Sequence, residues 1–517
     1  MKRTISFLMA MLMIVSLLAG CGGSSNSGAS DTPDNVFEVA TVRWSDWGEA
    51  YHTGFPDQAA EEVGIEIEWN TILNADWGDR KAVMIAGGNL PDAFMGSICV
   101  SESDIMTNAG TFIALDEYID EYMPNFKAIM EKDPTMKALA TAADGHIYGL
   151  PSKRPCRPTI ANQMFINKTW LDNLGLEMPT TYTEFVDVLK AFKAEDANGN
   201  GDPNDEIPYG GGMADIVMFF CLPFGTTLGA DGTYSMTIKD GQPVYLPTSE
   251  EYKAGIEWMH ECYEAGLIDP EIFTQDTSMR DAKLMGEISR VGVAVGWTPD
   301  ATFGPNSDEY VALPALIGPD GNQYISADPD HWNYARYEFV VTTDCKDPGK
   351  LLSWADKFYT EDASIQNFYG SFGIGTEKDA NGNYTILEPN DGNSADTFAW
   401  INSLRDFGPK YVGEDFNDKV TYAGENGDAT KLKLDAEMKQ YAGEAYPNVS
   451  FTQDQLNTLA TLYADIGAYV ATNQATWVTA GGIEEGWDSY ISTLERMGLN
   501  DFMQIMQDAY DTYQANK

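Results

Sequence analysis

The stretch FEVATV at residues 37–42 decides the fold of this chain. Its apolar and polar side chains alternate, which predicts a β-strand, and the polar and aromatic stretch RWSDWG follows at residues 43–48. Residues 65–69 alternate in the same way, residues 75–86 have helical spacing that stops at Gly87-Gly88, and residues 92–95 predict a short buried strand. Strand and helix therefore alternate, which is typical of an α/β fold with covering helices.

The N-terminal segment has the pattern of an export signal. Lys2 and Arg3 precede an apolar run from Ile5 to Ala19, which is too short to cross a bilayer core of about 30 Å as a helix. The run ends at LAGC, residues 18–21, which resembles the bacterial lipobox, where the cysteine receives a diacylglyceryl group. We therefore expect a signal peptide at residues 1–20 and a lipidated, flexible tether at residues 21–35, with Cys21 carrying the lipid. The alternative is an ordinary secretory signal with a chance cysteine.

Composition excludes several classes of partner. The chain has 517 residues, of which 43% are hydrophobic, so its body can bury a large core and should exceed one domain. A net charge of −47 argues against nucleic acid and against anionic lipid headgroups, because both need a basic face. No later segment has eighteen consecutive apolar residues, so the lipid anchor is the only membrane contact that we expect.

Four further motifs carry a family resemblance. They are GGNLPD at residues 87–92, DGHIYGLP at 144–151, PTTYTEF at 179–185 and AGLIDP at 265–270. Together with the lipobox, they make the chain similar to the family 1 extracellular solute-binding proteins of ABC importers. The resemblance is greatest to the long lipoprotein branch that is associated with oligosaccharide uptake.

The resemblance implies a fold and a function. The fold is α/β and periplasmic-binding-protein-like, of class II type: two lobes, each a mainly parallel sheet flanked by helices, with the ligand cleft between them. Lobe 1 would comprise residues 36–150 plus 328–372, and lobe 2 residues 151–327 plus 373–517. The protein would act as a monomer, held by its lipid at the extracellular face of the cell membrane. It would bind an oligosaccharide and deliver it to the membrane subunits of an ABC permease, with no catalytic cofactor.

Candidate ligand-binding residues follow predicted strands or crossovers, where ligands of open α/β sheets bind. A sugar presents an apolar C–H face and a rim of hydroxyl groups, so aromatic rings beside carboxylates, amides and guanidinium groups suit it. The candidates are Trp44, Asp46, Trp47, Asn74, Asp76, Trp77, Asp92, Arg154, Trp297, Asp300, Trp332 and Tyr369. Each tryptophan has packing in a core as its alternative role.

The stretch DANGNGDPNDE at residues 196–206 predicts a structural calcium site. Oxygen donors at alternate positions, with glycine at the turn, match the first half of an EF-hand loop. The candidate ligands are Asp196, Asn198, Asn200, Asp202, Asp205 and Glu206. Ile207 occupies the twelfth position, where an EF-hand has a glutamate, so Asp205 or Glu206 would have to replace it. The alternative is an acidic, solvated turn.

Two other functions stay open at this point. A secreted glycoside-active enzyme needs two carboxylates facing one bond, and 79 acidic residues always offer such a pair, so their abundance carries no evidence. The chain contains no GxSxG, HExxH or Walker A motif. A surface lipoprotein that binds a non-sugar ligand such as a peptide is the second alternative.

Overall fold

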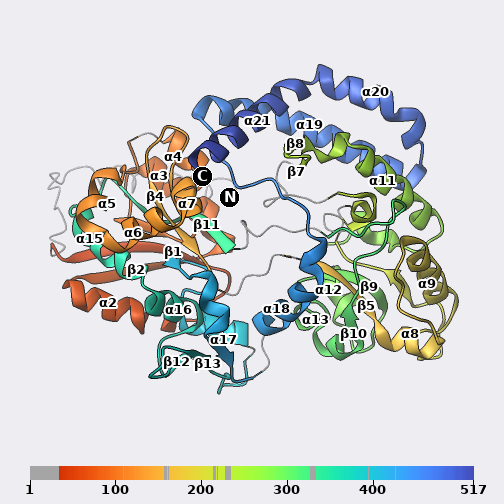
Figure 1. The fold of residues 1–517 in the computed structure, drawn as a ribbon, viewed down its shortest axis with the longest axis horizontal. Helices are drawn as coiled ribbons and strands as arrows, with labels where there is room; N and C mark the ends of the chain where they lie inside the picture. The colour runs from red at the N-terminus through yellow and green to blue at the C-terminus, as the bar shows by residue number, and fades with distance from the viewer. Residues whose placement is uncertain are drawn as a thin grey trace, which may run out of the picture. The chain divides into compact units, whose positions relative to one another are not determined.

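A computed structural model describes residues 34–108, 110–155, 160, 162–212, 217, 219–226, 235–325, 333–393, 395–424 and 427–517. The predicted signal peptide, Cys21 and Trp332 lie outside the described residues. Contacts divide the chain into residues 1–36 and one compact unit at residues 37–517. The α/β prediction is confirmed, because this unit contains two main sheets with helices packed around them (Figure 1).

The first sheet forms around the strand that the sequence predicted at residues 37–42. Its six strands, in spatial order, are β14 (Lys410–Tyr411), β4 (Gly149–Lys153), β11 (Tyr334–Val341), β3 (Ala93–Met95), β1 (Val36–Arg43) and β2 (Glu66–Leu73). β1 runs parallel to β3, with Val39 opposite Ala93, so the two strands end at the same edge of the sheet. The loop that follows β1 therefore lies at the same edge of the sheet as the loop that follows β3.

Helices cover this sheet and bury its apolar side chains. Phe37, Val39, Met95 and Phe339 belong to a core that also contains Trp354. The helices around this sheet are α2 (Phe55–Val63), α3 (Asn74–Gly87), α4 (Glu102–Thr107), α5 (Asp116–Tyr122), α6 (Pro124–Lys132), α7 (Pro134–Ala140), α15 (Pro348–Lys357), α16 (Glu361–Tyr369) and α17 (Ala395–Asn402).

The second sheet has four strands in the order β10 (Tyr310–Ala312), β5 (Gln163–Asn167), β9 (Val291–Gly296) and β6 (Ile207–Tyr209). Most of its strand residues are buried. Helices that pack on this sheet or share its cores are α8 (Lys168–Leu174), α9 (Tyr182–Ala194), α11 (Glu250–Glu264), α12 (Thr277–Leu284), α13 (Pro299–Phe303), α18 (Gly427–Met438), α19 (Gln453–Ala480), α20 (Ile483–Arg496) and α21 (Leu499–Asn516).

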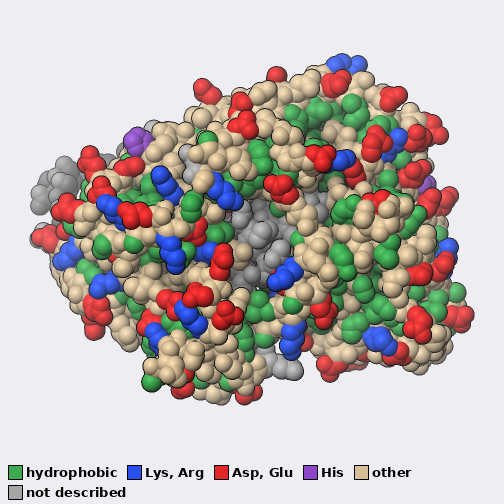
Figure 2. All heavy atoms as spheres, viewed as in Figure 1, with side chains coloured by type: hydrophobic (Ala, Val, Ile, Leu, Met, Phe, Trp, Pro, Cys, Tyr) green, Lys and Arg blue, Asp and Glu red, His purple; other side chains and the backbone are tan. Residues whose placement is uncertain are grey.

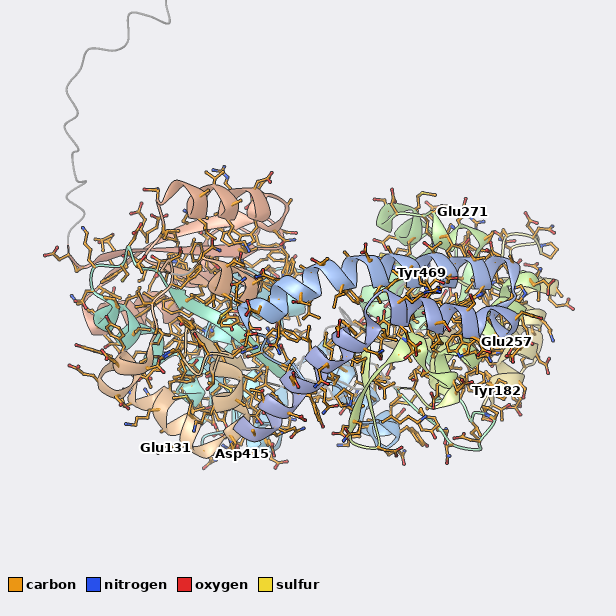
Figure 3. All side chains as sticks on the ribbon, turned by 90° about the horizontal axis from the view of Figure 1, so that it is seen from above. Glu131, Tyr182, Glu257, Glu271, Asp415 and Tyr469 are labelled. Carbon is orange, nitrogen blue, oxygen red and sulfur yellow. The ribbon has the colours of Figure 1, made fainter. Side chains whose placement is uncertain are left out.

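α19 and α20 pack against α11, and α21 packs against α19 and α20. Figure 3 shows Tyr469 on the long C-terminal helix α19. Tyr469 on α19 stacks on Tyr490 of α20 with ring centroids 5.6 Å apart, and Trp477 meets Tyr490 edge-on at 4.8 Å. Thr452 begins α19 with a capping box in which Gln455 is the partner residue. These contacts bury the apolar side of α19, which includes Ile466, Val470 and Trp477.

Smaller elements complete the structure. A three-stranded sheet has the order β12 (Thr376–Lys378), β13 (Tyr384–Ile386) and β15 (Val420–Tyr422), and β7 (Met236–Lys239) pairs with β8 (Gln242–Tyr245). Short 3₁₀ helices lie at Ala50–His52, Leu222–Phe224, Leu246–Thr248, Pro270–Phe273, Gly304–Glu309, Glu414–Asp418 and Lys439–Tyr441.

Two details of the predicted organisation need correction. The sheets are mixed rather than mainly parallel, because β11 is antiparallel to both β3 and β4, and β5 is antiparallel to both β9 and β10. Alternation in a sequence predicts a strand without giving its direction. β14 lies within the range 373–517 predicted for lobe 2, yet it pairs with β4 in the first sheet, next to Ser152 and Lys153. The remaining lobe boundaries stay a prediction.

The surface reflects the acidic composition. Asp and Glu side chains spread over the visible face among neutral residues, with fewer Lys and Arg side chains between them (Figure 2). Within the described part of the chain, no helix has both the length and the apolar character needed to cross a membrane.

Candidate functional site

Four aromatic rings gather where β1 ends. Trp47 stacks on Trp400 of α17, with centroids 5.4 Å apart and an angle of 23° between the rings. Trp44 packs against Phe407 at 5.9 Å, and Phe407 meets Trp400 edge-on at 5.4 Å. Trp44 nevertheless leaves 47% of its surface exposed. We call Trp44, Trp47, Trp400 and Phe407 the aromatic platform, because it combines packed rings with ring surface that is open to solvent.

The buried guanidinium of Arg43 supports this platform. It lies 4.4 Å from the ring centroid of Tyr51, 5.2 Å from that of Trp400 and 5.5 Å from that of Trp47. It also donates hydrogen bonds to the carbonyl oxygens of Trp400 and Ser403. Burial lowers the pKa of Arg43 to about 10, so the group stays charged at neutral pH. The cation therefore joins the end of β1 to the loop after α17.

Polar groups beside the platform suit the hydroxyl rim of a sugar. Asp46 is exposed between the two tryptophans, and one of its carboxylate oxygens accepts a bond from the Gly48 amide at 3.2 Å. The rest of its hydrogen-bonding capacity faces solvent. The predicted residues Trp44, Asp46 and Trp47 thus come together in one place.

In the second sheet, Trp297 follows the end of β9 as predicted. Its ring is partly exposed, and the ammonium of Lys431 on α18 lies 4.4 Å from the ring centroid. Asp300 is exposed in the first turn of α13, which Thr298 caps. These two residues form a separate polar and aromatic group.

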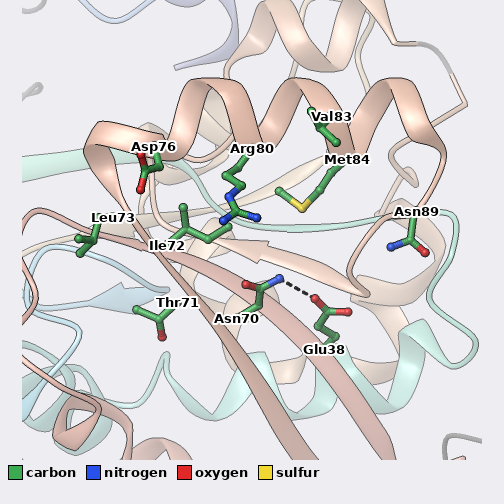
Figure 4. A pocket seen from close by; sticks show the side chains of 10 residues that line it. All are labelled: Glu38, Asn70, Thr71, Ile72, Leu73, Asp76, Arg80, Val83, Met84 and Asn89. Atoms are coloured by element: carbon green, nitrogen blue, oxygen red, sulfur yellow. Dashed lines mark hydrogen bonds between the residues drawn. The ribbon is translucent and has the colours of Figure 1, made fainter. Parts of the chain in front are cut away.

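A pocket of about 370 Å³ lies between β2 and α3 (Figure 4). Its lining residues are Glu38, Asn70, Thr71, Ile72, Leu73, Asp76, Arg80, Val83, Met84 and Asn89. Asn70 donates to Glu38 across its floor at 2.7 Å. The candidate Asp76 lines this pocket, and the candidate Asn74 is exposed at the first position of α3. No aromatic ring lines the pocket, so it lacks a stacking surface for a sugar.

Four candidates have structural partners instead. Trp77 is only 5% exposed and donates its indole N–H to the Cys99 carbonyl, so it is a core residue. Tyr369 is buried in the core that contains Phe416. The expected ligand contacts of these two rings need correction, because a buried ring cannot stack on a ligand.

Asp92 and Arg154 also bind the protein itself. Asp92 accepts the Glu38 amide at 2.8 Å, at the end of the sheet opposite to the platform, and burial raises the pKa of Asp92. Arg154 pairs with the buried carboxylate of Glu338 at 3.2 Å. A position after a strand is therefore insufficient to identify a ligand-binding residue.

The loop 196–206 folds back on itself between α9 and β6. Asp196 accepts the Gly201 amide at 2.9 Å, Asn198 accepts the Asn200 amide at 2.9 Å, and Asn200 accepts the Asp202 amide at 2.7 Å. The carboxylate of Asp205 accepts the side-chain amides of both asparagines. Side-chain oxygens at alternate positions thus accept amide hydrogen bonds from within the same loop.

Two buried carboxylate oxygens in this loop have no hydrogen-bond partner. They are Oδ1 of Asp196 and Oε2 of Glu206, and burial raises the pKa of Glu206. Unpaired buried oxygens are costly unless a cation neutralises them. Among the described residues, no three His, Cys, Asp or Glu side chains gather closely enough for a metal ion, so a site here must include the asparagine oxygens. The donor set is all oxygen, as calcium prefers.

Comparison with known proteins decides the family. The family model described as "bacterial extracellular solute-binding protein" matches residues 43–365, which begin at the last residue of β1 and include the loop 196–206 and β11. The chain belongs to this family. The two-lobe fold of such solute-binding proteins accounts for the two main sheets.

Characterised relatives of this solute-binding protein cover most of its length. The fructooligosaccharide ABC transporter substrate-binding protein FusA of Streptococcus pneumoniae is 33% identical over 479 residues, covering 88% of this chain and 86% of FusA. A structure of FusA with kestose has a TM-score of 0.78 at 30% identity and covers 93% of this chain and 100% of FusA.

Two further structures extend the comparison. A FusA structure described as an EF-hand mutant with fructo-nystose has a TM-score of 0.78 at 30% identity, covering 93% of this chain and 100% of FusA. An HMO binding, ABC-transporter associated solute-binding protein of Bifidobacterium longum infantis has a TM-score of 0.80 at 28% identity. That match covers 92% of this chain and 99% of the other.

Half of the platform was not predicted from the sequence. Trp400 and Phe407 lie more than 350 residues after Trp47 in the chain, and only folding brings them to the end of β1. The segment RDFGPK at residues 405–410 gave one signal, since a bulky ring before Gly-Pro marks a turn that presents a side chain. Arg43 was predicted to belong to the polar stretch after the strand, whereas the structure makes it the last and buried residue of β1.

Proposed function

We propose that this solute-binding protein captures an oligosaccharide on the aromatic platform. The observation that carries the proposal is the grouping of Trp44, Trp47, Trp400 and Phe407 around the end of β1, with the exposed carboxylate of Asp46 between them. Rings bind the apolar face of a sugar, and carboxylates accept hydrogen bonds from its hydroxyl groups. The similarity to FusA supports this choice of ligand class.

The energetics of such a platform suit a soluble nutrient. Each ring contact adds about 0.5–1.5 kcal/mol beyond the burial of its area. Two rings therefore supply about 1–3 kcal/mol of the roughly −8 kcal/mol that corresponds to a Kd of about 1 μM, and hydrogen bonds and buried area would supply the rest. Binding at this strength captures a dilute sugar and still permits its release.

Contacts from both lobes would favour a closed state. In this proposal, Trp297 and Asp300 contribute from the second sheet and the platform from the first. A ligand that contacts both lobes shifts the equilibrium toward closure by its difference in affinity between the two states. The loaded protein, a monomer, would then deliver the sugar to an ABC permease at the extracellular face of the membrane.

Residues 196–206 would hold a structural calcium ion. Asp196, Glu206 and the oxygens of Asn198 and Asn200 would be its ligands, with Asp202 contributing a backbone carbonyl. The ion supplies the positive charge that the two unpaired carboxylate oxygens need. The EF-hand named in the FusA mutant structure supports this assignment.

Calorimetry against a panel of sugars tests the ligand. Kestose, nystose, a maltooligosaccharide and a short neutral peptide are titrated into the purified body, residues 36–517. We expect one class of oligosaccharide to bind with a micromolar Kd and to be recovered intact. Binding of the peptide alone, or cleavage of the sugar, would contradict the proposal and favour one of the two other functions.

A second experiment tests the anchor. The Cys21→Ser variant of the full chain cannot receive a thioether-linked lipid, so we expect it in the culture medium instead of the membrane fraction. Retention of this variant on the membrane would show that another segment anchors the protein.

A further inference from the structure

The carboxylate of Glu338 lies on β11, fully buried, and collects four hydrogen bonds. Its Oε1 accepts from the Ser152 hydroxyl and from the Arg154 guanidinium, both at 3.2 Å. Its Oε2 accepts from the backbone amides of Ser97 at 3.1 Å and Gly408 at 3.0 Å. One side chain thus joins β4, the loop after β3 and the turn that carries Phe407.

The turn at residues 406–409 is held from several sides by buried groups. Arg154 donates its Nε to the Asp406 carbonyl at 3.3 Å. The ammonium of Lys410, also fully buried, donates to the carbonyls of Phe407 at 2.7 Å and Gly408 at 2.6 Å. Together with the bond from Gly408 to Glu338, these contacts fix the backbone on both sides of the Phe407 ring.

Burying the charged groups of Glu338, Arg154 and Lys410 costs free energy, so stability alone does not explain this arrangement. Burial raises the pKa of Glu338, and the neighbouring Lys410 and Arg154 oppose that shift. Well-packed apolar residues often replace buried ion pairs without loss of stability, so such pairs are weak evidence for a stabilising role. A network with every partner satisfied instead specifies one conformation.

We propose that Glu338 is a positioning residue of the sugar site. Through Gly408 and Arg154 it holds the turn 406–409 in the conformation that places the Phe407 ring against Trp44 and Trp400. A platform fixed before binding loses less conformational freedom when the sugar arrives. This inference rests on the proposed function, because it assumes that the platform receives the sugar.

The test compares Glu338→Gln with a matched variant, Asp356→Asn. Asp356 is also a buried carboxylate that accepts backbone amides, from Asn125 and Phe126, but it joins α15 to α6 and has no contact with the platform. In Glu338→Gln the new NH₂ group faces either the Arg154 guanidinium or the amides of Ser97 and Gly408, which are all donors. In either orientation the side chain therefore loses a hydrogen bond to Arg154 or to Gly408, through which it holds the turn. Both variants are made in the body at residues 36–517.

Two measurements are made at a temperature where both variants are folded. Hydrogen exchange is followed in peptides that cover residues 404–411, and kestose affinity is measured by calorimetry. We expect Glu338→Gln to speed exchange in these peptides and to weaken binding roughly tenfold, as for a loss of preorganisation. Asp356→Asn should lower Tm without changing exchange in residues 404–411 and with less than about a twofold change in Kd.

The possible outcomes separate this inference from the proposed function. Unchanged exchange in Glu338→Gln, or unchanged affinity in a chain whose Trp47→Ala variant loses binding, would overturn the positioning role alone. Equal losses of affinity in both carboxylate variants would show general destabilisation and would also overturn it. Unchanged oligosaccharide affinity in both Trp44→Ala and Trp47→Ala would show that the aromatic platform does not bind the sugar. That result would overturn both the proposed function of the platform and the positioning role of Glu338. The exchange measurement needs no ligand, so it tests whether Glu338 holds the turn 406–409 even if kestose does not bind.

Discussion

The aromatic platform and the loop 196–206 are two candidate ligand sites that are built in opposite ways. The loop takes all its groups from eleven consecutive residues, and its bonds join partners two to eight positions apart. The platform joins Trp47 to Trp400 and Arg43 to Ser403, more than 350 positions apart. One site is therefore a property of a segment, and the other depends on the first sheet together with α17 and the turn that follows it.

The two sites should therefore respond differently to substitutions. The loop 196–206 should lose calcium binding when one of its own side chains is changed. Loss of calcium would affect the rest of the protein only through its stability. A platform assembled from distant segments also fails when the supports of those segments change, as Glu338 and Arg43 illustrate. Sugar binding should therefore respond to distant core substitutions, whereas calcium binding should not.

The largest expected effect concerns calcium. At a free concentration one hundred times Kd, calcium should stabilise the folded protein by about 2.7 kcal/mol, because it binds only the folded loop. Asp196→Asn should abolish this gain, measured as the shift in thermal unfolding between calcium and a chelator. The matched control is Asp379→Asn, which changes the same DANGN motif where it forms the β12–β13 hairpin. An equal calcium response in both variants would rule out the loop.

Trp47→Ala should weaken oligosaccharide binding by about 2 kcal/mol, or roughly thirtyfold in Kd, since a stacking ring is removed. Calorimetry with the sugar that binds the wild-type body measures this change. Tyr469→Ala is the control, because Tyr469 is also partly exposed and stacks on a ring, that of Tyr490 at 5.6 Å, within the C-terminal helices. Comparable losses in both variants would show that the platform has no special role.

A pair of glycine variants separates the effect of backbone strain on affinity from the effect of disturbing the turn 406–409. Gly408 and Gly321 both have φ at +81°, so alanine costs about 1 kcal/mol at each position. At Gly408 the added Cβ would also lie 3.1 Å from Leu404 and 3.3 Å from Asn367, whereas at Gly321 it would meet open space. We expect Gly408→Ala alone to reduce sugar affinity. Equal behaviour of the two variants in unfolding and in binding would contradict the role of this turn.

The smallest effect is a pH dependence of calcium stabilisation. The raised pKa of Glu206 means that, without calcium, the contribution of this group to stability is present at low pH and is lost as pH rises through that pKa. Calcium needs the ionised carboxylate, so its stabilising effect should grow as pH rises and fade as pH falls through the same pKa. Thermal unfolding with and without calcium across this range measures it. A calcium effect that is constant with pH would exclude Glu206 as a ligand.

Local patterns in the sequence were sufficient for several elements around the first sheet. The strand predicted at residues 37–42 is part of β1, and the helix predicted at residues 75–86 is α3, which ends at Gly88 with φ at +62°. The turn chemistry at residues 196–206 was also readable, because side-chain to backbone bonds over two positions depend on neighbouring residues alone.

Local sequence patterns could not predict the direction of a strand or the contacts between residues that are distant in the chain. The sheets were expected to be mainly parallel, yet β11 runs antiparallel to its neighbours, and β14 joins β4 from residues assigned to the other lobe. Trp77 and Trp47 both follow predicted strands, but one is buried against Cys99 and the other stacks on Trp400. Their difference depends on what packs against them from elsewhere in the chain.

The sequence by itself thus determined the α/β class, the family resemblance and the acidic loop 196–206, because composition, periodicity and turn chemistry act over a few residues. Only the tertiary structure decided that Trp400 and Phe407 complete the platform and that Glu338 supports it. The physical reason is that ring stacking and buried charge pairing act between atoms a few ångströms apart in space, whatever their separation along the chain.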